Sequence, residues 1–212
     1  MAKDGVPFVL GSFGVAILCV ALWLVLRWEV WRVLGVISFV FGAFCAYFFR
    51  DPDRAIPQEA GAVVSPGDGK VVEIVAEDDR YVGKGAQRVS IFLSLFDVHV
   101  NRVPVSGSVA GVTYNPGKYL LAFDEKASAN NEQTHIGIKS ERGPVAFKQI
   151  AGFIARRIVC TLTPGDSVRI GDRCGLIRFG SRVDILLPPG AMLRVQRGQR
   201  VRGGETIVGL LP

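Results

Sequence analysis

The stretch "VCTLTPGDSVRIGDRCGLIRFG", residues 159–180, has a near repeat in "LRVQRGQRVRGGETIVGLL", residues 193–211. Each stretch contains a Gly-Asp or Gly-Gln pair, a valine two residues later, another glycine and then an apolar strand. Two turn-and-strand units at similar spacing predict a compact β sandwich.

The rest of the chain beyond residue 51 has the same character, because short runs of valine and isoleucine alternate with glycine, proline and aspartate. This pattern predicts many short strands joined by tight turns. The polar stretch 123–134 predicts a loop. We therefore expect residues 51–212 to form one mostly-β domain, built as a compact sandwich or a barrel-like structure. The clearest strand candidates are residues 70–75, 88–93, 107–113 and 168–170.

Residues 1–50 have a different composition and predict a helical membrane hairpin. Residues 8–26 and 33–49 are two uncharged apolar runs. At about 1.5 Å per helical residue, each covers roughly 25–29 Å, close to the ~30 Å hydrocarbon core of a bilayer. The segment 27–32 between them carries two tryptophans and two arginines, as a membrane interface favours. A signal peptide followed by a core helix fits less well, because no small-residue cleavage site precedes the second run.

Charge and cysteine content narrow the class of protein. The net charge is +6, and residues 1–50 contribute +2 from four Lys/Arg and two Asp/Glu, so the β domain carries +4. That balance favours an anionic membrane surface as a partner, and we expect no nucleic-acid partner. The four cysteines lack C-x-x-C spacing, which predicts neither a metal site nor a disulfide framework and is compatible with the cytoplasm.

Three short segments contain residues suited to catalysis. His99 lies in "SLFDVHVNRVP", Asp68 in the turn "SPGDGK", and Gly180-Ser181 between two apolar runs. Taken singly, each has an ordinary structural explanation as a buried histidine or a turn residue. Together, a serine, a histidine and an aspartate are the groups that activate a hydroxyl, although their spacing does not establish that they meet. The other histidine, His135, lies in the polar stretch "NNEQTHIGI", and we expect it at the surface.

Five segments in this order resemble the phosphatidylserine decarboxylase family, and more specifically its short bacterial and archaeal branch. The resemblance covers nearly the whole chain, and "FGSRVD" is its most specific part. The segments are "FFRDPDR" (48–54), "SPGDGKV" (65–71), "DVHVNRVP" (97–104), "NNEQT" (130–134) and "RFGSRVDILLP" (178–188).

The resemblance implies a proenzyme that cuts its own chain between Gly180 and Ser181. Ser181 Oγ attacks the carbonyl of Gly180 and converts the amide to an ester, and glycine permits the close approach because it has no Cβ. Removal of the Cα proton of Ser181 then breaks the bond between its Cβ and the ester oxygen by β-elimination, which releases the upstream chain as a carboxylate. The dehydroalanine that remains hydrolyses to a pyruvoyl group and ammonia. The products are a large β chain, residues 1–180, and a small α chain, residues 181–212, which form a heterodimer.

The resemblance also implies the reaction. The pyruvoyl group formed from Ser181 is the cofactor, and it forms a Schiff base with the amine of phosphatidylserine in the bilayer. The electrons left by CO₂ pass into the conjugated imine, and the product is phosphatidylethanolamine, a step of phospholipid biosynthesis. The enzyme would then be located at the cell membrane, with its catalytic domain on the cytoplasmic face.

The family's histidine and aspartate correspond to His99 and Asp68. His99 is expected to act as general acid or base, because the ordinary pKa of histidine lies near working pH. Asp68 is expected to orient His99 or stabilise its charged form. Longer family members carry a second histidine where this chain has Arg102. Either His99 serves both self-cleavage and decarboxylation, or Arg102 binds the substrate phosphate or carboxylate.

Two other functions remain open at this point. Hammerhead-type repeats such as 159–180 and 193–211 also occur in biotinyl and lipoyl carriers, and Lys126 in "DEKA" resembles a lipoyl-lysine turn. That lysine, however, lies in a polar stretch away from the repeats. A pyruvoyl-dependent decarboxylase of a soluble amino acid is the second alternative, and the apolar hairpin argues against it.

Overall fold

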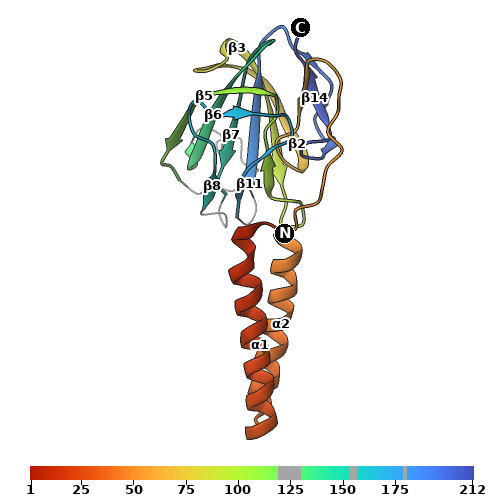
Figure 1. Ribbon diagram of the computed structural model, residues 1–212, viewed down its shortest axis with the longest axis vertical. Helices are drawn as coiled ribbons and strands as arrows, with labels where there is room; N and C mark the ends of the chain where they lie inside the picture. Colours follow the sequence, from red (N-terminus) through yellow and green to blue (C-terminus); the bar gives the residue numbers. More distant parts are fainter. Residues whose placement is uncertain (119–129, 153–156, 179–180) are drawn as a thin grey trace. The chain divides into compact units, whose positions relative to one another are not determined.

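The computed structural model describes residues 1–118, 130–152, 157–178 and 181–212. The chain divides into two compact units, Met1–Pro52 and Asp53–Pro212. The first is a pair of helices, and the regular elements described in the second are nearly all strands (Figure 1). The predicted fold class, a mostly-β domain preceded by two apolar helices, is therefore confirmed.

The first unit is an antiparallel helical hairpin. A short 3₁₀ turn, η1 (Lys3–Gly5), leads into α1 (Val6–Leu26), and α2 (Glu29–Phe48) follows after two residues. The turn is tight because Arg27 adopts a left-handed backbone conformation with φ of 58°, and its N–H donates a hydrogen bond to the carbonyl of Trp23. The second helix therefore begins four residues earlier than the apolar run indicates, and it includes part of the segment expected at the interface.

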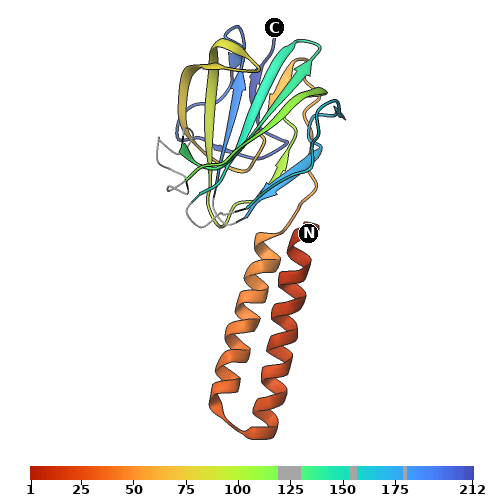
Figure 2. The same cartoon turned by 90° about the vertical axis from the view of Figure 1, so that its left-hand side faces the viewer.

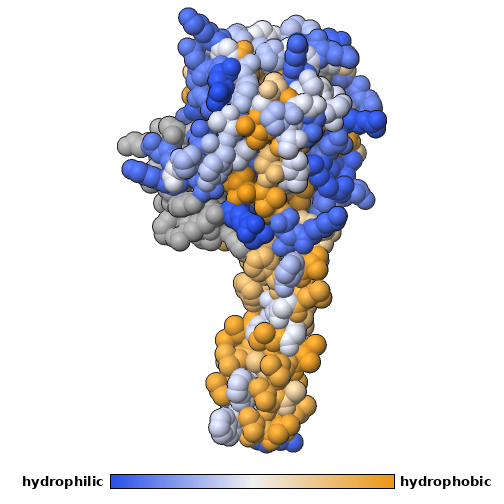
Figure 3. Space-filling view, turned by 60° about the vertical axis from the view of Figure 1, so that its left-hand side comes forward, coloured by the Kyte–Doolittle hydropathy of each residue, from blue (hydrophilic) through white to orange (hydrophobic). Residues whose placement is uncertain are grey.

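Small residues bring the two helices together. A methyl group on Gly42 of α2 would lie 3.2 Å from Cβ of Ser12, and one on Gly35 would lie 3.4 Å from Cβ of Cys19. Such close backbone approach is typical of helix pairs in lipid. The segments Lys3–Leu26 and Glu29–Phe48 are long and apolar enough to cross a bilayer by length and composition. Apolar side chains cover most of the surface of the hairpin in Figure 3.

The second unit is built on one curled sheet of eight strands (Figure 2). Its strand order is β13-β2-β3-β11-β7-β6-β5-β9, with antiparallel pairing throughout. The strands are β2 (Gly69–Asp79), β3 (Gly83–Leu93), β5 (Gly107–Asn115), β6 (Gln133–Ser140), β7 (Gly143–Ile150), β9 (Ser167–Val168), β11 (Ser181–Leu187) and β13 (Arg200–Val201). Of the polar loop expected at residues 123–134, residues 123–129 lie outside the described residues. Its last two residues, Gln133 and Thr134, are not in a loop, because they begin β6.

Two three-stranded sheets complete the domain. One has the order β1-β14-β12 and the other β4-β10-β8. Valine, isoleucine and leucine side chains from these sheets and from the large sheet form one buried core. The strands are β1 (Ala62–Val64), β14 (Ile207–Leu210), β12 (Met192–Leu193), β4 (Val100–Arg102), β10 (Arg173–Ile177) and β8 (Ile158–Cys160).

The two sequence repeats have the same backbone geometry. The first glycines, Gly165 and Gly198, have φ values of 94° and 91°, and the second glycines, Gly171 and Gly204, have 84° and 78°. These left-handed conformations favour glycine, which explains its recurrence at this spacing. In both copies, the side-chain oxygen after the first glycine accepts a hydrogen bond from the backbone N–H three residues earlier. The strands that follow the first glycines, β9 and β13, form the two edges of the eight-stranded sheet.

Candidate active site

Ser181 is the first residue of β11, which lies between β3 and β7 in the large sheet. It pairs with Leu93, the last residue of β3. Because side chains alternate along a strand, Ser181 shares a face with the core residue Val183. Ser181 is fully buried, and among the described residues its Oγ has no hydrogen-bond partner. Buried hydroxyl groups are usually hydrogen-bonded, so a buried hydroxyl without a partner is unusual, and its role as a nucleophile stays a prediction. Gly180 lies outside the described residues.

Arg182 points to the opposite face of β11. Its Nε donates to Asp184 Oδ1 at 2.8 Å, and its Nη2 donates to Glu73 Oε2 at 2.6 Å. Arg88 binds the same two carboxylates, at 3.4 Å and 2.9 Å. This buried network ties β2, β3 and β11 together on the face away from the Ser181 side chain.

His99 lies just before β4, in the connection that follows β3. Its side chain is buried, and its Nδ1 lies 3.0 Å from the carbonyl oxygen of Asp97. A carbonyl can only accept, so Nδ1 carries a proton and the neutral ring has its lone pair on Nε2. The Asp97 carboxylate in turn accepts hydrogen bonds from the backbone N–H and hydroxyl of Ser94, at 2.9 and 2.6 Å. Since β3 ends opposite Ser181, this turn places His99 at the same end of the sheet.

Asp68 lies in the turn between β1 and β2, as the "SPGDGK" pattern indicates. Its two carboxylate oxygens accept hydrogen bonds from Arg54 Nη2 at 3.1 and 2.9 Å, and Oδ1 accepts another from the Gly203 N–H at 2.8 Å. Within the described ranges these are its partners, and the His99 ring is not among them. Its role in orienting His99 stays a prediction. The sequence reasoning missed Arg54 as the partner, although Arg54 ends the "FFRDPDR" segment.

Arg102 is the last residue of β4 and is largely buried. Its backbone N–H donates to the carbonyl of Pro66, and its Nη1 donates to the carbonyl of Gly171, both at 2.9 Å. The residue therefore links the turn that carries Asp68 to a turn of the first repeat. Its role in binding substrate stays a prediction.

Close packing brings these segments together. A methyl group on Gly67 would lie 3.3 Å from Leu93 Cδ2 and 3.6 Å from Val183 Cγ2. Thus the Asp68 turn touches the end of β3 and the start of β11, while Arg102 connects the same turn to β4. The candidate residues therefore come from three segments that lie close together, namely the Asp68 turn, residues 99–102 and the start of β11.

His135 corrects the sequence-based expectation of a surface position. It is buried in β6, and its Nε2 lies 3.0 Å from Asp79 Oδ2. Its ring also packs edge-on against Tyr81, with centroids 4.9 Å apart. The polar residues before His135 favoured a surface position. The prediction was wrong because neighbouring strands cover β6 and because Asp79, the charged partner of His135, is distant in the sequence.

The Asp79–His135 pair predicts a pH-dependent contribution to stability. Burial raises the pKa of Asp79, but interaction with His135 and the backbone N–H groups of Tyr81 and Val82 outweighs burial and lowers it to about 2. Because the folded pKa is depressed, the stabilisation is complete above about pH 4 and is lost as the pH falls towards 2. Asp79→Asn should cost about 1–2 kcal/mol at pH 7 once solvent screening is allowed for, and almost nothing near pH 2.

Denaturant unfolding of the wild type and Asp79→Asn between pH 2 and 7 measures this difference. Asp78→Asn is a matched control, since Asp78 is the neighbouring carboxylate and is exposed. A constant difference between wild type and Asp79→Asn across the range would contradict the assignment.

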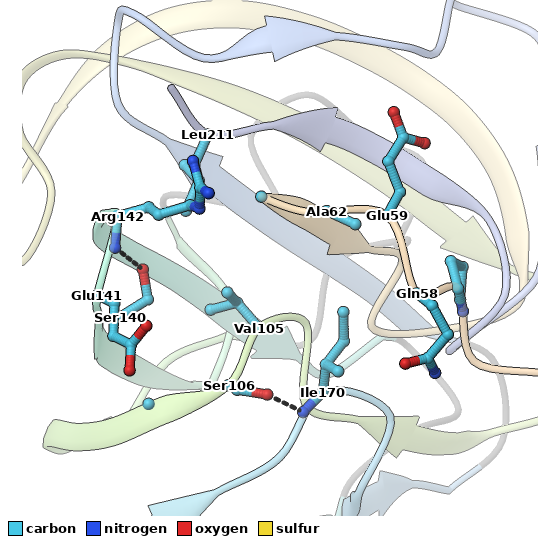
Figure 4. A pocket seen from close by; sticks show the side chains of 13 residues that line it. Gln58, Glu59, Ala62, Val105, Ser106, Ser140, Glu141, Arg142, Ile170 and Leu211 are labelled. Carbon is cyan, nitrogen blue, oxygen red and sulfur yellow. Dashed lines mark hydrogen bonds between the residues drawn. The ribbon is translucent and has the colours of Figure 1, made fainter.

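The cavity in Figure 4 is lined by other residues of the domain. It has a volume of about 330 Å³, and its lining includes Arg142, Glu141 and Glu59. Among the described residues that line it, none is a predicted site residue. A larger cavity, of about 590 Å³, borders Arg182 and Glu73. Neither cavity contains Ser181 in its lining, so cavity size does not locate the site.

Comparison with known proteins gives a consistent match. The sequence model described as phosphatidylserine decarboxylase matches residues 41–209. A phosphatidylserine decarboxylase proenzyme of Chlorobium chlorochromatii is 50% identical over 190 residues, covering 90% of this chain and 89% of the relative. The proenzyme of Prosthecochloris aestuarii is 47% identical over 176 residues, covering 83% and 81%. That of Chlorobaculum tepidum is 45% identical over 177 residues, covering 84% and 82%. The chain therefore belongs to the phosphatidylserine decarboxylase family.

Proposed function

We propose that this protein cuts its own chain between Gly180 and Ser181 and then decarboxylates phosphatidylserine to phosphatidylethanolamine, as an enzyme of phospholipid biosynthesis. The observation that carries the proposal is the Ser181 hydroxyl, which is fully buried and has no hydrogen-bond partner among the described residues. An unsatisfied buried polar group costs about 1–3 kcal/mol. Participation of the Ser181 hydroxyl in self-cleavage would explain why an unsatisfied polar group stands at the start of a central strand.

The surroundings of Ser181 fit a pyruvoyl group made from this residue. The position is buried beside Leu93 and Val183, whose apolar side chains exclude water from competing reactions. The ketone of a pyruvoyl group supplies an electrophile for the substrate amine and an electron sink for the bond to the departing carboxylate.

His99 is the side chain proposed to move protons. Its Nδ1 is held by the Asp97 carbonyl, so Nε2 is the atom that accepts and returns protons. In self-cleavage it takes the proton from the Ser181 hydroxyl, and in decarboxylation it delivers a proton to the α-carbon of the substrate after CO₂ has left. Arg102 is the candidate for binding an anionic group of the substrate.

After cleavage, the two chains are expected to stay together as a heterodimer. The segment 181–212 supplies β11, which pairs with β3 and β7 of the larger chain. It also supplies β13, paired with β2, and β14, paired with β1. The backbone hydrogen bonds of these three strands and a shared core are therefore expected to hold the smaller chain in place after the peptide bond is cut.

The helical hairpin is proposed to anchor the enzyme in the cell membrane, either spanning it or half-inserted. A lipid with two acyl chains is most accessible to an enzyme held at the bilayer surface. The +4 charge of the β domain favours anionic lipid. The proposed cytoplasmic position of that domain agrees with its two cysteines, Cys160 and Cys174, both of which are unpaired.

Release of CO₂ from alternative substrates tests this function. The full-length protein in detergent or vesicles should release CO₂ from phosphatidylserine and show little activity on free serine at the same concentration. Phosphatidylethanolamine should accumulate in equal amount. Equal rates on the lipid and on a soluble amino acid would instead favour the amino-acid decarboxylase alternative. The carrier alternative rests on Lys126, which lies outside the described residues.

A further inference from the structure

Two buried amide side chains lie next to the candidate site. Asn101 is in β4 and Gln149 is in β7, and both side chains are fully buried. Gln149 Nε2 donates to Asn101 Oδ1 at 2.9 Å and to the carbonyl of Val159 at 3.3 Å. The pair therefore joins the large sheet to a small one through the domain interior.

These contacts fix the orientation of both amides. The Val159 carbonyl can only accept, so the Gln149 atom that faces it must be the donor Nε2. The Asn101 atom that faces Nε2 must then be the acceptor Oδ1. Asn101 Nδ2 and Gln149 Oε1 are left over, and neither has a hydrogen-bond partner among the described residues. Buried amide atoms are rarely left unpaired, which points to a ligand or a reacting group as the missing partner.

The unpaired donor faces the interior close to Ser181. A methyl group on Gly67 would lie 3.3 Å from both Asn101 Nδ2 and Leu93 Cδ2. Leu93 pairs with Ser181, and Gln149 pairs with Val183, two residues along the same face of β11. The Asn101 donor, the Gln149 acceptor and the Ser181 hydroxyl thus lie in the same part of the interior, and all three lack partners among the described residues.

We propose that Asn101 Nδ2 donates a hydrogen bond to the oxyanion that forms at the carbonyl of residue 180 during self-cleavage, and that Gln149 is the positioning residue for Asn101. This inference rests on the proposed function. Ser181 Oγ forms a bond to the carbonyl carbon and its proton passes to a base, while the carbonyl π electrons move to the oxygen. Collapse of this adduct breaks the C–N bond, the Ser181 nitrogen takes a proton, and an ester remains.

Geometry and electrostatics support this role. In the adduct, the carbonyl carbon is bonded to both the nitrogen and Oγ of Ser181, so the oxyanion is tied to the Ser181 side chain. A donor already held in place in a water-excluded interior stabilises developing charge without reorganisation. Removal of one such donor in other enzymes typically slows the reaction about 10²–10³-fold.

A time course of chain splitting, with and without hydroxylamine, tests the proposal. Hydroxylamine cleaves an ester but leaves the amide intact. Asn101→Ala and Asn101→Asp both remove the N–H donor, and the aspartate keeps the shape of the side chain. Both full-length variants should split about 10²–10³-fold more slowly than wild type. Hydroxylamine should not restore splitting, because the slow step precedes the ester.

Matched variants separate this role from a structural one. Gln87→Ala removes another amide with structural partners, the carbonyls of Pro188, Pro189 and Ala191. It should split at the wild-type rate even if its unfolding temperature falls. Gln149→Met keeps the volume but releases Asn101, and it should slow splitting at least about tenfold.

Each outcome bears on a different claim. Wild-type rates in folded Asn101 variants would overturn this inference alone, as would rapid cleavage of those variants by hydroxylamine, because the ester would then form without the donor. If the Asn101 variants do not fold, a wild-type rate for Gln149→Met overturns it. A wild-type protein that never splits before Ser181 would instead overturn the proposed function.

Discussion

Replacing Ser181 by alanine is expected to leave one uncut chain with no decarboxylase activity. Alanine has no hydroxyl for the acyl shift, so neither the ester nor the pyruvoyl group can form. The substitution removes a buried oxygen that has no hydrogen bond among the described residues, so the uncut variant should still fold. A denaturing gel, beside CO₂ release from phosphatidylserine, measures both effects.

Ser167→Ala is the matched control, since Ser167 is an exposed serine in β9. It should split and turn over as the wild type does. A small fragment that still begins at residue 181 in the Ser181→Ala protein would show that another group cuts the chain.

Substitution of His99 by alanine is expected to impair two steps at once. Self-cleavage should slow because the Ser181 proton loses its acceptor, and any mature enzyme should turn over slowly because the substrate carbon loses its proton donor. Loss of a general acid–base group typically costs about 10²–10⁴-fold. The time course of splitting and the decarboxylation rate of the mature fraction measure the two steps separately.

Arg102→Ala provides the contrast. If the guanidinium binds an anionic group of the substrate, this variant should split nearly normally and show a raised KM. Its unfolding temperature should also fall, because Arg102 is buried and donates to the Gly171 carbonyl. Assays should therefore run well below that temperature.

Normal maturation and turnover of His99→Ala would contradict the role proposed for His99, and would mean that Asp68 or water moves the protons.

The parts of the fold that local sequence determines were predictable. The glycines of the two repeats recur because left-handed turns require them, and Gly165 and Gly198 adopt nearly identical φ values. The apolar helices followed from length and composition. Helix α2 nevertheless begins before the apolar run, and its first turn contains the charged residues Glu29 and Arg32, which form an ion pair of 2.8 Å. Apolar content alone cannot mark that boundary.

The contacts that define the site depend on residues far apart in the chain. Asp68 binds Arg54 and Gly203, and Asn101 meets Gln149, pairings that neither periodicity nor spacing reveals. The family motifs identified Ser181, His99 and Asp68 as candidates but not their partners. His135 was misjudged for the same reason, because burial depends on which strands cover β6.

The intact masses of the purified wild-type chains are the sharpest test of self-cleavage at Ser181. Two chains are expected, divided between Gly180 and Ser181. The smaller should be lighter than the peptide Ser181–Pro212 by the mass of one ammonia, because a pyruvoyl group replaces the amino-terminal serine. A single chain with the mass of all 212 residues, or a small chain that begins with an unmodified serine, would contradict it.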